Sequence, residues 1–339
     1  MLNNREEKIK VIRNLLWLPG IYSFLLKRVR KQQGFLKKEL EPELEPFRRE
    51  NEGSLTEAHF KKITSYYAMG VPSILGESLC VLRGFPITLE ERLCMSYLGG
   101  VSGLLDDLFD ESGKSADHLE DFIFSPEELI PATCHEQLLK HFYIKGLSYS
   151  SKPEEIKKAA FEVFKAQQMS LDQKESASKE QIKDLTFLKG GNSFIYYRLG
   201  LSHVLYEKEE KMLYQLGGIM QLGNDIFDVW EDTRDGIATI ATSTSNLKVL
   251  RKYFTAELEK THTMLADIGL EAKTEKRFKR MINLALARVY VCLDQYEALA
   301  IKKSGKFNVM NYSRNQLICD MQKPKNQVKA INYYLKTRA

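Results

Sequence analysis

The chain has 339 residues, of which 43% are apolar and 28% are charged. This composition is ordinary for a globular protein and excludes a chain that is disordered throughout. The net charge of +5 is a mild excess and not the concentrated basic stripe of a nucleic-acid-binding protein, so no nucleic-acid partner is expected.

The cysteines and the chain start bear on the cellular compartment. Five cysteines are scattered along the chain, with no Cys-x-x-Cys pair, which excludes a disulfide scaffold and a zinc ribbon. No stretch reaches the ~18 apolar residues of a membrane span, and the start MLNNREEKIK lacks the apolar core of a signal peptide. We therefore expect a cytoplasmic protein without a membrane span.

Residues 1–45 combine a short apolar run with a basic cluster. One interpretation is an amphipathic segment that makes peripheral contact with an anionic membrane surface. The other, which we favour because Pro19-Gly20 interrupts the run, is an N-terminal helix that packs on the rest of the protein. Residues 46–339 are expected to form a single α-helical domain.

Helix signals dominate the rest of the chain. No proline occurs from Glu154 to Lys323, and apolar residues recur there at helical spacing. Ser54, Ser125 and Ser178 each begin a pattern typical of a helix start. Alternation of period two over the length of a strand is hard to find. The sequence therefore predicts an all-α protein with roughly ten to twelve helices.

A first acidic motif lies in the apolar run of residues 94–112, which carries Asp106, Asp107 and Asp110. Asp106 and Asp110 share one face of the predicted helix, where like charges repel. Their neighbours are mainly leucine and phenylalanine, so the helix should be largely buried, and uncompensated carboxylates would be costly there. A hard divalent cation, most simply Mg²⁺, would compensate them.

A second acidic motif follows 118 residues later. Asn224, Asp228 and Asp232 are spaced by four residues and face one way on a helix with apolar flanks. The alternative for each motif is a solvated acidic face or a helix end. Because two oxygen-rich stripes each lie within an apolar helix, we favour a metal site shared across one cavity.

The two motifs resemble those of a known superfamily. Asp106-Asp107-Leu108-Phe109-Asp110 is similar to the DDxxD motif of class I isoprenoid synthases. The segment from Asn224 to Asp232 resembles the NSE or DTE motif of class I terpene cyclases and, with Gln221, the second aspartate motif of squalene and phytoene synthases. The resemblance implies a helical bundle of the class I isoprenoid synthase type around a central apolar cavity.

The resemblance also implies a prenyl diphosphate substrate and three Mg²⁺ ions, which Mn²⁺ can replace. Asp106 and Asp110 would hold two ions, with Asp107 completing that acidic set. The third ion would bind Asn224, Asp228 and Asp232. These five ligands, without Asp107, would be the catalytic residues. Dimers are common in this superfamily, which makes a homodimer an option.

Basic side chains would bind the diphosphate. Lys189 precedes Gly190-Gly191, similar to the Lys-Thr-Gly segment of chain-elongating synthases, and the glycine pair is expected to break a helix and offer N–H groups to an anion. Near the C-terminus, many cyclases carry an Arg-Tyr pair. The candidates are Lys189, Arg198, Arg234, Tyr312 and Arg314. For each basic residue the alternative is a surface charge.

Residues one and two turns before the ligands are expected to line the cavity. In the superfamily that the motifs resemble, bulky side chains just before the first motif make the pocket shallow. Val101 and Ser102 are small, which favours a deep pocket and a C20 geranylgeranyl chain over a C15 farnesyl chain. The alternative is that small residues allow close helix packing. The predicted lining residues are Gly99, Ser102, Gly103, Phe194, Tyr197, Gly217, Met220, Gln221 and Phe227.

The surroundings of the first motif separate reaction types. No Arg pair follows it and no Gly-Lys-Arg segment precedes it, so a site for isopentenyl diphosphate is not expected. We predict a Mg²⁺-dependent class I terpene synthase that ionises geranylgeranyl or farnesyl diphosphate, cyclises the carbocation and releases diphosphate. One alternative is a head-to-head prenyl coupling enzyme of the squalene and phytoene synthase type. The other is a non-catalytic helical protein.

Overall fold

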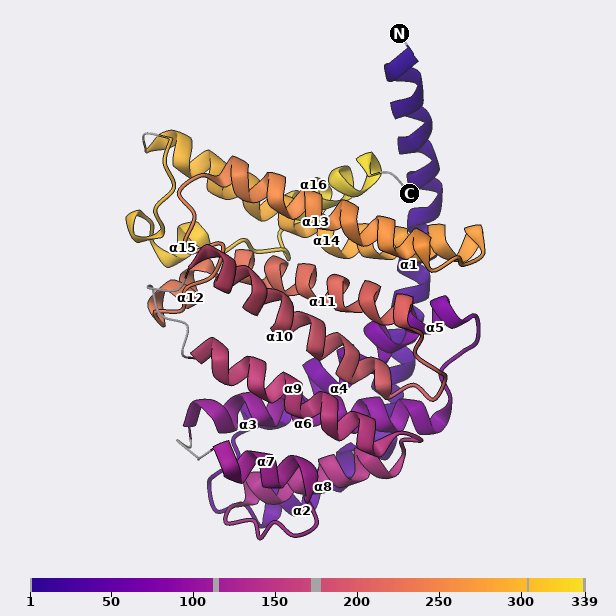
Figure 1. Ribbon diagram of the computed structural model, residues 1–339, viewed down its shortest axis with the longest axis vertical. Coiled ribbons are helices and arrows are strands. Elements are labelled where there is room, and N and C mark those ends of the chain that lie inside the picture. Colours follow the sequence, from indigo (N-terminus) through magenta and orange to yellow (C-terminus); the bar gives the residue numbers. More distant parts are fainter. Residues whose placement is uncertain (1, 112–115, 172–177, 304, 338–339) are drawn as a thin grey trace. The chain divides into compact units, whose positions relative to one another are not determined.

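The computed structural model describes residues 2–111, 116–171, 178–303 and 305–337, and side chains in the same ranges apart from 2–5, 106–111, 116–118 and 171. Within these ranges every regular element is a helix (Figure 1), which confirms the all-α prediction. The α-helices are α1 Leu2–Glu39, α2 Glu41–Arg49, α3 Glu57–Lys61, α4 Ala68–Gly70, α5 Glu77–Arg83, α6 Leu89–Glu111, α7 Ala116–Phe124, α8 Cys134–Ser148, α9 Pro153–Leu171, α10 Lys179–Leu199, α11 Glu207–Phe227, α12 Val229–Arg234, α13 Leu247–Asp267, α14 Ala272–Lys302, α15 Arg314–Leu317 and α16 Pro324–Lys336. Two π-helical turns, η1 Lys62–Tyr67 and η2 Val71–Gly76, and one 3₁₀ turn, η3 Val309–Asn311, complete the set.

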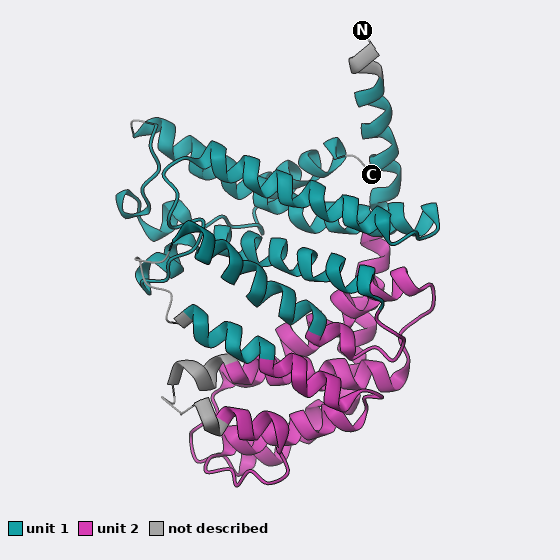
Figure 2. Cartoon of the chain, viewed as in Figure 1, with its two compact units in different colours: residues 1–20, 162–195, 206–339 teal, residues 21–161, 196–205 magenta. Residues whose placement is uncertain are grey.

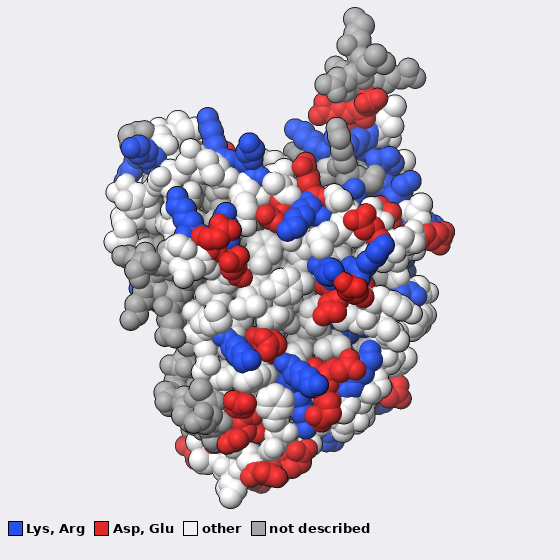
Figure 3. Space-filling model, viewed as in Figure 1, with Lys and Arg blue, Asp and Glu red and all other residues white. Residues whose placement is uncertain are grey.

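The chain forms two compact units (Figure 2). Unit 1 comprises residues 1–20, 162–195 and 206–339, and unit 2 comprises residues 21–161 and 196–205. The boundary predicted at residue 45 lies within α2, inside unit 2, so the division into a segment and a single domain stays a prediction. Acidic and basic side chains are interspersed over the face of the molecule seen in Figure 3.

Unit 2 is built around α6, the helix that carries the first acidic motif. Its buried Leu98, Val101 and Leu104 form part of an apolar core. Gly100 lets α6 lie against the Phe142 ring of α8, because a side chain at Gly100 would meet that ring at 2.6 Å. The motif therefore follows a segment of helix held in a packed core.

Unit 1 contains α11 and α12, which carry the second acidic motif. The apolar side of α11, with Leu213, Leu222 and Ile226, is buried. Neighbouring helices contribute Phe254 from α13 and Leu293 from α14 to the same unit's core. Helices α10, α11, α13 and α14 are long and lie in the proline-free half of the chain, so the prediction of long helices there is confirmed.

The predicted helix starts have different outcomes. At Ser178 the prediction is confirmed, because its hydroxyl accepts a bond from the Gln181 N–H while Gln181 accepts the Ser178 N–H. At Ser54 it is wrong, since α3 is capped by Thr56 and Ser54 accepts the His135 N–H instead. At Ser125 it is also wrong, because residues after Phe124 form turns.

The first helix runs without a break through Pro19-Gly20, contrary to the expected interruption. A proline inside a helix removes one hydrogen bond and leaves the carbonyl four residues earlier unpaired. Here that carbonyl belongs to Leu15, and both Leu15 and Pro19 are exposed, so water can reach the freed group. The local cost is therefore small enough for the helix to continue.

The segment Glu6–Glu39 of α1 is long and apolar enough to cross a membrane, judged only by length and composition. Just 17% of its most apolar window is buried. The sequence prediction of no span relied on an unbroken apolar stretch, which Lys10 and Arg13 interrupt. Length and composition do not distinguish a span from a helix packed on a protein.

Candidate functional site

The second acidic motif lies where α11 ends and α12 begins. Asp228 separates the two helices, and its backbone N–H donates to the Asn224 carbonyl at 2.9 Å. The Asn224 side-chain amide donates to an Asp228 carboxylate oxygen at 2.7 Å. Asp232 follows one turn later, with its N–H on the Asp228 carbonyl at 2.9 Å. The three predicted ligands are thus stacked on successive turns.

The Asp232 carboxylate has an unusual environment. One of its oxygens is buried and has no hydrogen-bond partner. Burial, followed by the charges of Asp225 and Asp228, raises the pKa of Asp232 to about 8. The pKa of Asp228 is raised as well, first by burial and then by Glu231. Carboxylates that repel one another in this way are stabilised in the ionised form by a cation placed among them.

Asp225 adds a further carboxyl group, which faces α10. Its side chain is almost fully buried and accepts bonds from Gln221 Nε2 at 2.8 Å and Thr186 Oγ1 at 3.2 Å. Burial raises its pKa to about 6, against the effect of both bonds. No role was predicted for Asp225 from the sequence, yet it is the most deeply buried carboxyl of the motif.

Lys189 is the cation that α10 brings to this motif. Its charge opposes the rise in the pKa of Asp225, Asp228 and Asp232. The structure therefore places this predicted residue beside the second motif. It stands on a continuous helix, because α10 runs unbroken through Gly190-Gly191. The expected helix break with exposed N–H groups is wrong.

The glycines have a packing role instead. A Cβ atom on Gly190 would overlap the carbonyl oxygen of Gly217 on α11, and a Cβ on Gly217 would overlap that of Gly190. Only glycine at both positions lets the two backbones touch. This close crossing carries Lys189 of α10 to the carboxylates of α11.

Two arginines complete the charged surroundings. Arg288 of α14 lies over the Phe227 ring, with its guanidinium carbon 5.4 Å from the ring centroid. It is accessible to solvent, yet the surrounding protein lowers its pKa by desolvation, and Asp228 opposes that shift. Arg314 of α15 forms an ion pair with Glu231 at 3.5 Å. Of these two, the sequence analysis predicted only Arg314.

Arg288 had a signal in the sequence that was overlooked. It is a single charge within the apolar run from Leu284 to Val291. A lone arginine in an apolar run is unusual, because charged side chains on the apolar part of a helix generally have a partner or a ligand. Its partner, Asp228, is 60 residues away in the chain, so the sequence did not identify it.

The other predicted diphosphate residues lie in different environments. Arg198 is fully buried, and its guanidinium donates to the carbonyls of His203 and Val204 at 3.3 Å and 3.1 Å. Because these bonds occupy the guanidinium, we do not include Arg198 among the proposed diphosphate ligands. Arg234 is exposed and pairs with its neighbour Asp235 at 2.7 Å.

Tyr312 is buried, although its hydroxyl has no hydrogen-bond partner. Its ring stacks on Phe307 with centroids 5.6 Å apart, and Lys303 lies 5.2 Å from the ring centroid. The 3₁₀ turn that precedes Tyr312 contacts α12, the helix of Asp232. A role of Tyr312 toward the diphosphate stays a prediction.

Among the predicted lining residues, close packing accounts for the three glycines. A side chain on Gly99 would meet the Tyr67 carbonyl at 2.9 Å, and one on Gly103 would meet the Tyr67 ring at 2.8 Å. Gly217 faces Gly190, as described above. The structure thus favours close packing as the reason for these glycines. The deep pocket, expected from Val101 and Ser102, stays a prediction.

The remaining predicted lining residues are half-buried, namely Ser102, Phe194, Tyr197, Met220, Gln221 and Phe227. In unit 2 the Tyr197 hydroxyl donates to Ser102 Oγ at 2.8 Å. In unit 1, Gln221 binds Asp225, and Phe227 lies beneath Arg288. Their contact with a cavity stays a prediction.

The first acidic motif belongs to α6 of unit 2, but the side chains of Asp106, Asp107 and Asp110 lie outside the described residues. Among the side chains described, no group of three or more His, Cys, Asp or Glu residues is arranged to hold a metal ion. The second motif includes an amide, that of Asn224, so its ligands do not form such a group by themselves. Their oxygen donors and the unpartnered Asp232 oxygen nevertheless fit Mg²⁺.

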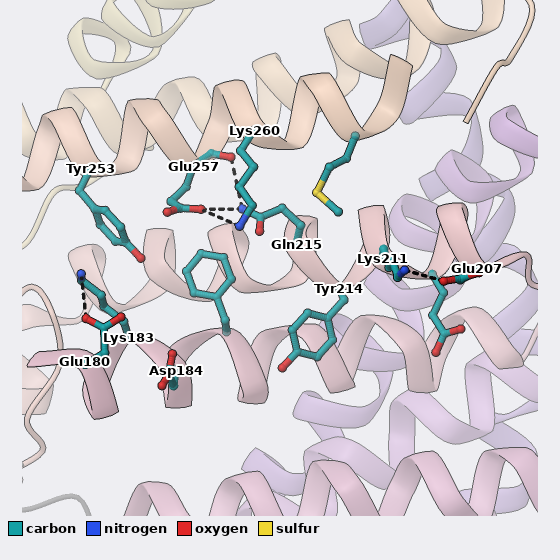
Figure 4. A pocket seen from close by; sticks show the side chains of 13 residues that line it. Glu180, Lys183, Asp184, Glu207, Lys211, Tyr214, Gln215, Tyr253, Glu257 and Lys260 are labelled. Carbon is teal, nitrogen blue, oxygen red and sulfur yellow. Dashed lines mark hydrogen bonds and ion pairs between the residues drawn. The ribbon is translucent and has the colours of Figure 1, made fainter. Parts of the chain in front are cut away.

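Unit 1 also has a groove of about 710 Å³ between α10, α11 and α13 (Figure 4). Phe187, Tyr214 and Tyr253 form its apolar part. Around them lie ion pairs such as Lys211 with Glu207 at 2.5 Å. None of the residues predicted for the diphosphate site lines this groove, so it is not the site of the second motif.

Comparisons with known proteins give limited information. No protein-family model matches the chain, and no curated protein is significantly similar to it in sequence. Among solved structures, the chain is similar to a dehydrosqualene synthase in complex with a ligand. The identity is 14%, the TM-score is 0.40, and the similarity covers 82% of this chain and 96% of the other. At this identity and TM-score the similarity carries no argument about the function of this chain.

Proposed function

We propose that the protein is a metal-dependent enzyme that ionises a prenyl diphosphate. The observation that carries this proposal is the charge arrangement at the second motif. Asn224, Asp228 and Asp232 are stacked on one another, and Lys189 and Arg288 interact with their carboxylates. A site that binds both a cation and a phosphate group needs these two kinds of side chain close together.

Each side chain has a separate task in this proposal. Asn224, Asp228 and Asp232 would hold Mg²⁺, which when bound neutralises charge that develops on the leaving diphosphate. Lys189 and Arg288 would bind diphosphate oxygens directly through charge-assisted hydrogen bonds.

The ion pair of Arg314 with Glu231 joins α15 to α12. If the guanidinium leaves Glu231 for the diphosphate, the C-terminal segment can bind together with the substrate. Asp106 and Asp110 are proposed as ligands of the other ions, on the strength of their sequence motif.

The finer proposal is a terpene synthase that acts on a single allylic diphosphate and cyclises the carbocation. It is supported by the surroundings of the first motif, which lack the Arg pair that binds a second diphosphate in chain-elongating synthases. A carbocation must be kept from water, and aromatic faces such as Phe227 can stabilise it. Geranylgeranyl and farnesyl diphosphate are both proposed substrates.

Head-to-head prenyl coupling is the second candidate. It is favoured by Asp228 and Asp232, two aspartates four residues apart, with Glu231 directly before the second of them. This pattern resembles the second aspartate motif of squalene and phytoene synthases. The distinction concerns the fate of the cation after ionisation, so both reactions use the same carboxylates.

Product analysis tests the proposal. The full chain is incubated with Mg²⁺ and each prenyl diphosphate from C10 to C25, with EDTA in parallel, and products are identified by mass spectrometry. Cyclic hydrocarbons would support the terpene synthase, and C30 or C40 products would support coupling. The absence of turnover with every substrate would overturn both.

A matched pair of variants links turnover to the site. Asp228→Ala should lower diphosphate release by about 10²-fold or more, because it removes a ligand of the charge-neutralising cation. Asp267→Ala removes an exposed aspartate at the end of α13 and should leave the rate unchanged. Equal rates in both variants would contradict the assignment of the second motif.

A further inference from the structure

The first turns of α1 expose a row of apolar side chains. Ile9, Ile12, Leu15 and Leu16 are between 51% and 76% exposed. They lie within about 120° of one another around the helix. Large apolar side chains that gather on one helix face mark an interaction surface, whereas single ones do not. We call these four residues the α1 apolar row.

The opposite side of the same turns packs against other helices of unit 1. The Asn14 amide is fully buried and donates to the carbonyls of Leu335 and Thr337, at the end of α16, at 3.1 Å and 3.0 Å. Trp17 lies under the guanidinium of Arg280, 4.5 Å from the ring centroid. A helix that crossed a bilayer would have to give up these bonds. The structure therefore supports a helix that lies along a surface and does not span a membrane.

Basic residues accompany the α1 apolar row. Lys8, Lys10 and Arg13 lie within the same turns, and four more basic residues occur between residues 27 and 31 of the same helix. Glu6 and Glu7 are the acidic residues before the row. In Figure 3 basic side chains surround the base of the projecting helix, and acidic ones lie nearer its tip. Apolar side chains next to lysine and arginine are typical of helices that bind anionic lipid surfaces.

We propose that the α1 apolar row docks on the surface of a bilayer that contains anionic phospholipids. A second copy of this chain is a poorer occupant, because a two-fold interface brings the same patch of both copies together, including Lys8, Lys10 and Arg13. Anionic headgroups instead complement these charges. The proposal goes beyond the proposed function and does not depend on it.

Vesicle binding tests the proposal on the full chain. Co-sedimentation is measured with vesicles of phosphatidylcholine and phosphatidylserine, and with vesicles of phosphatidylcholine alone. The wild-type chain should bind the anionic vesicles and bind less as salt is raised, because salt screens the lysines. Its binding to the neutral vesicles should be weaker by a factor of about ten or more, since the electrostatic attraction is missing.

Matched substitutions locate the contact. Ile12→Glu with Leu16→Glu should weaken binding to anionic vesicles about tenfold or more, because it places negative charge on the helix face that would enter the bilayer. Val249→Glu with Ile301→Glu is the control, since these residues of α13 and α14 are 60% and 77% exposed, close to the 58% and 76% of Ile12 and Leu16. Circular dichroism verifies that both variants keep their helices.

Substitution of the lysines tests the electrostatic part of the contact separately from the apolar part. Lys8→Glu with Lys10→Glu should also weaken binding to anionic vesicles, whereas Lys248→Glu with Lys273→Glu, at exposed positions of α13 and α14, should not. The proposal is overturned if the wild-type chain stays in the supernatant with both vesicles. It is equally overturned if the control pairs lose binding as much as the α1 pairs. If the wild-type chain self-associates but does not bind vesicles, and Ile12→Glu with Leu16→Glu abolishes the self-association, the α1 apolar row would instead bind a second copy of the chain.

Discussion

Arg288 shows how much a single residue can depend on a partner far away in the chain. It lies over Phe227 and interacts with Asp228, at the turn where α11 gives way to α12. A planar guanidinium that is accessible to solvent and close to the carboxylates proposed to hold Mg²⁺ is well suited to bind a phosphate group. No pattern within α14 itself indicates this function, although the lone charge in an apolar run does mark the residue as unusual.

Removal of this guanidinium should therefore impair substrate binding. Arg288→Ala is expected to raise the KM for the prenyl diphosphate about tenfold to a hundredfold, because a charge-assisted hydrogen bond is worth about 1.5–3 kcal/mol. Steady-state kinetics of diphosphate release measure the effect. Lys273→Ala, on the same helix at an exposed position, is the control and should not change the KM. An unchanged KM in Arg288→Ala would show that other cations bind the diphosphate.

The buried carboxyls should make stability depend on pH. Asp232, whose pKa burial raises to about 8, holds its proton more tightly in the folded protein than in the unfolded chain. In metal-free protein the folded state therefore loses stability as pH rises from about 4 toward about 8. Asp232→Asn removes this penalty, so its free energy of unfolding should exceed that of the wild type by an amount that grows between pH 5 and pH 8.

Urea unfolding in EDTA at several pH values measures this difference. The comparison with the wild type is essential, because the lowered pKa values of His203 and His262, both about 4, contribute their own pH dependence. Those two histidines are unchanged in the variant and cancel. Asp267→Asn, an exposed aspartate, is the control and should give a difference that does not vary with pH.

At the scale of elements, the crossing of α10 and α11 decides the geometry of the site. The backbones touch at Gly190 and Gly217, where neither position has room for a Cβ atom. The sequence analysis interpreted Gly190-Gly191 as a helix break that would bind an anion. The structure shows a continuous helix in which the same glycines permit close approach. Local sequence did not separate the two interpretations, because both require glycine for its lack of a side chain.

Substitution at this crossing should be destabilising. Gly190→Ala is expected to lower the free energy of unfolding by about 1–3 kcal/mol, since a methyl group overpacks the contact and pushes α10 from α11. Thermal unfolding followed by circular dichroism measures the loss. Gly34→Ala, on an exposed part of α1 with nothing near its Cβ position, should be neutral or stabilising, by up to about 1 kcal/mol.

At the scale of the whole molecule, the cation and the diphosphate should bind together. In the proposed site, Mg²⁺ would compensate the carboxylates of the second motif, and the phosphates would contact both the ion and the nearby Lys189 and Arg288. Ligands that bind only the folded state stabilise it. Inorganic diphosphate with Mg²⁺ is therefore expected to raise the melting temperature more than either alone.

Differential scanning fluorimetry measures these shifts, with Ca²⁺ and inorganic phosphate as comparison ligands. The synergy should disappear in Asp228→Ala and persist in Asp267→Ala. Shifts that simply add would contradict a shared site for the ion and the diphosphate.

The sequence by itself determined the helical class and the spacing of the second motif. Both are local properties, since side-chain periodicity and the four-residue spacing of Asn224, Asp228 and Asp232 are fixed by the geometry of one helix turn. The capping box at Ser178 belongs to the same group, because its partners are three residues apart. At Ser125 an equally local pattern produced no helix, so local preference can be overridden by the surrounding fold.

Only the tertiary structure decided which residues accompany that motif. The partners Thr186, Lys189 and Arg288 come from helices 36 to 60 residues distant from the motif residues that they meet. The tertiary structure also decided that Asp225 is buried, although its neighbour in the chain, Asn224, is exposed. Contacts of this kind arise from helix crossings, whose closeness depends on pairs such as Gly190 and Gly217 that no single segment contains.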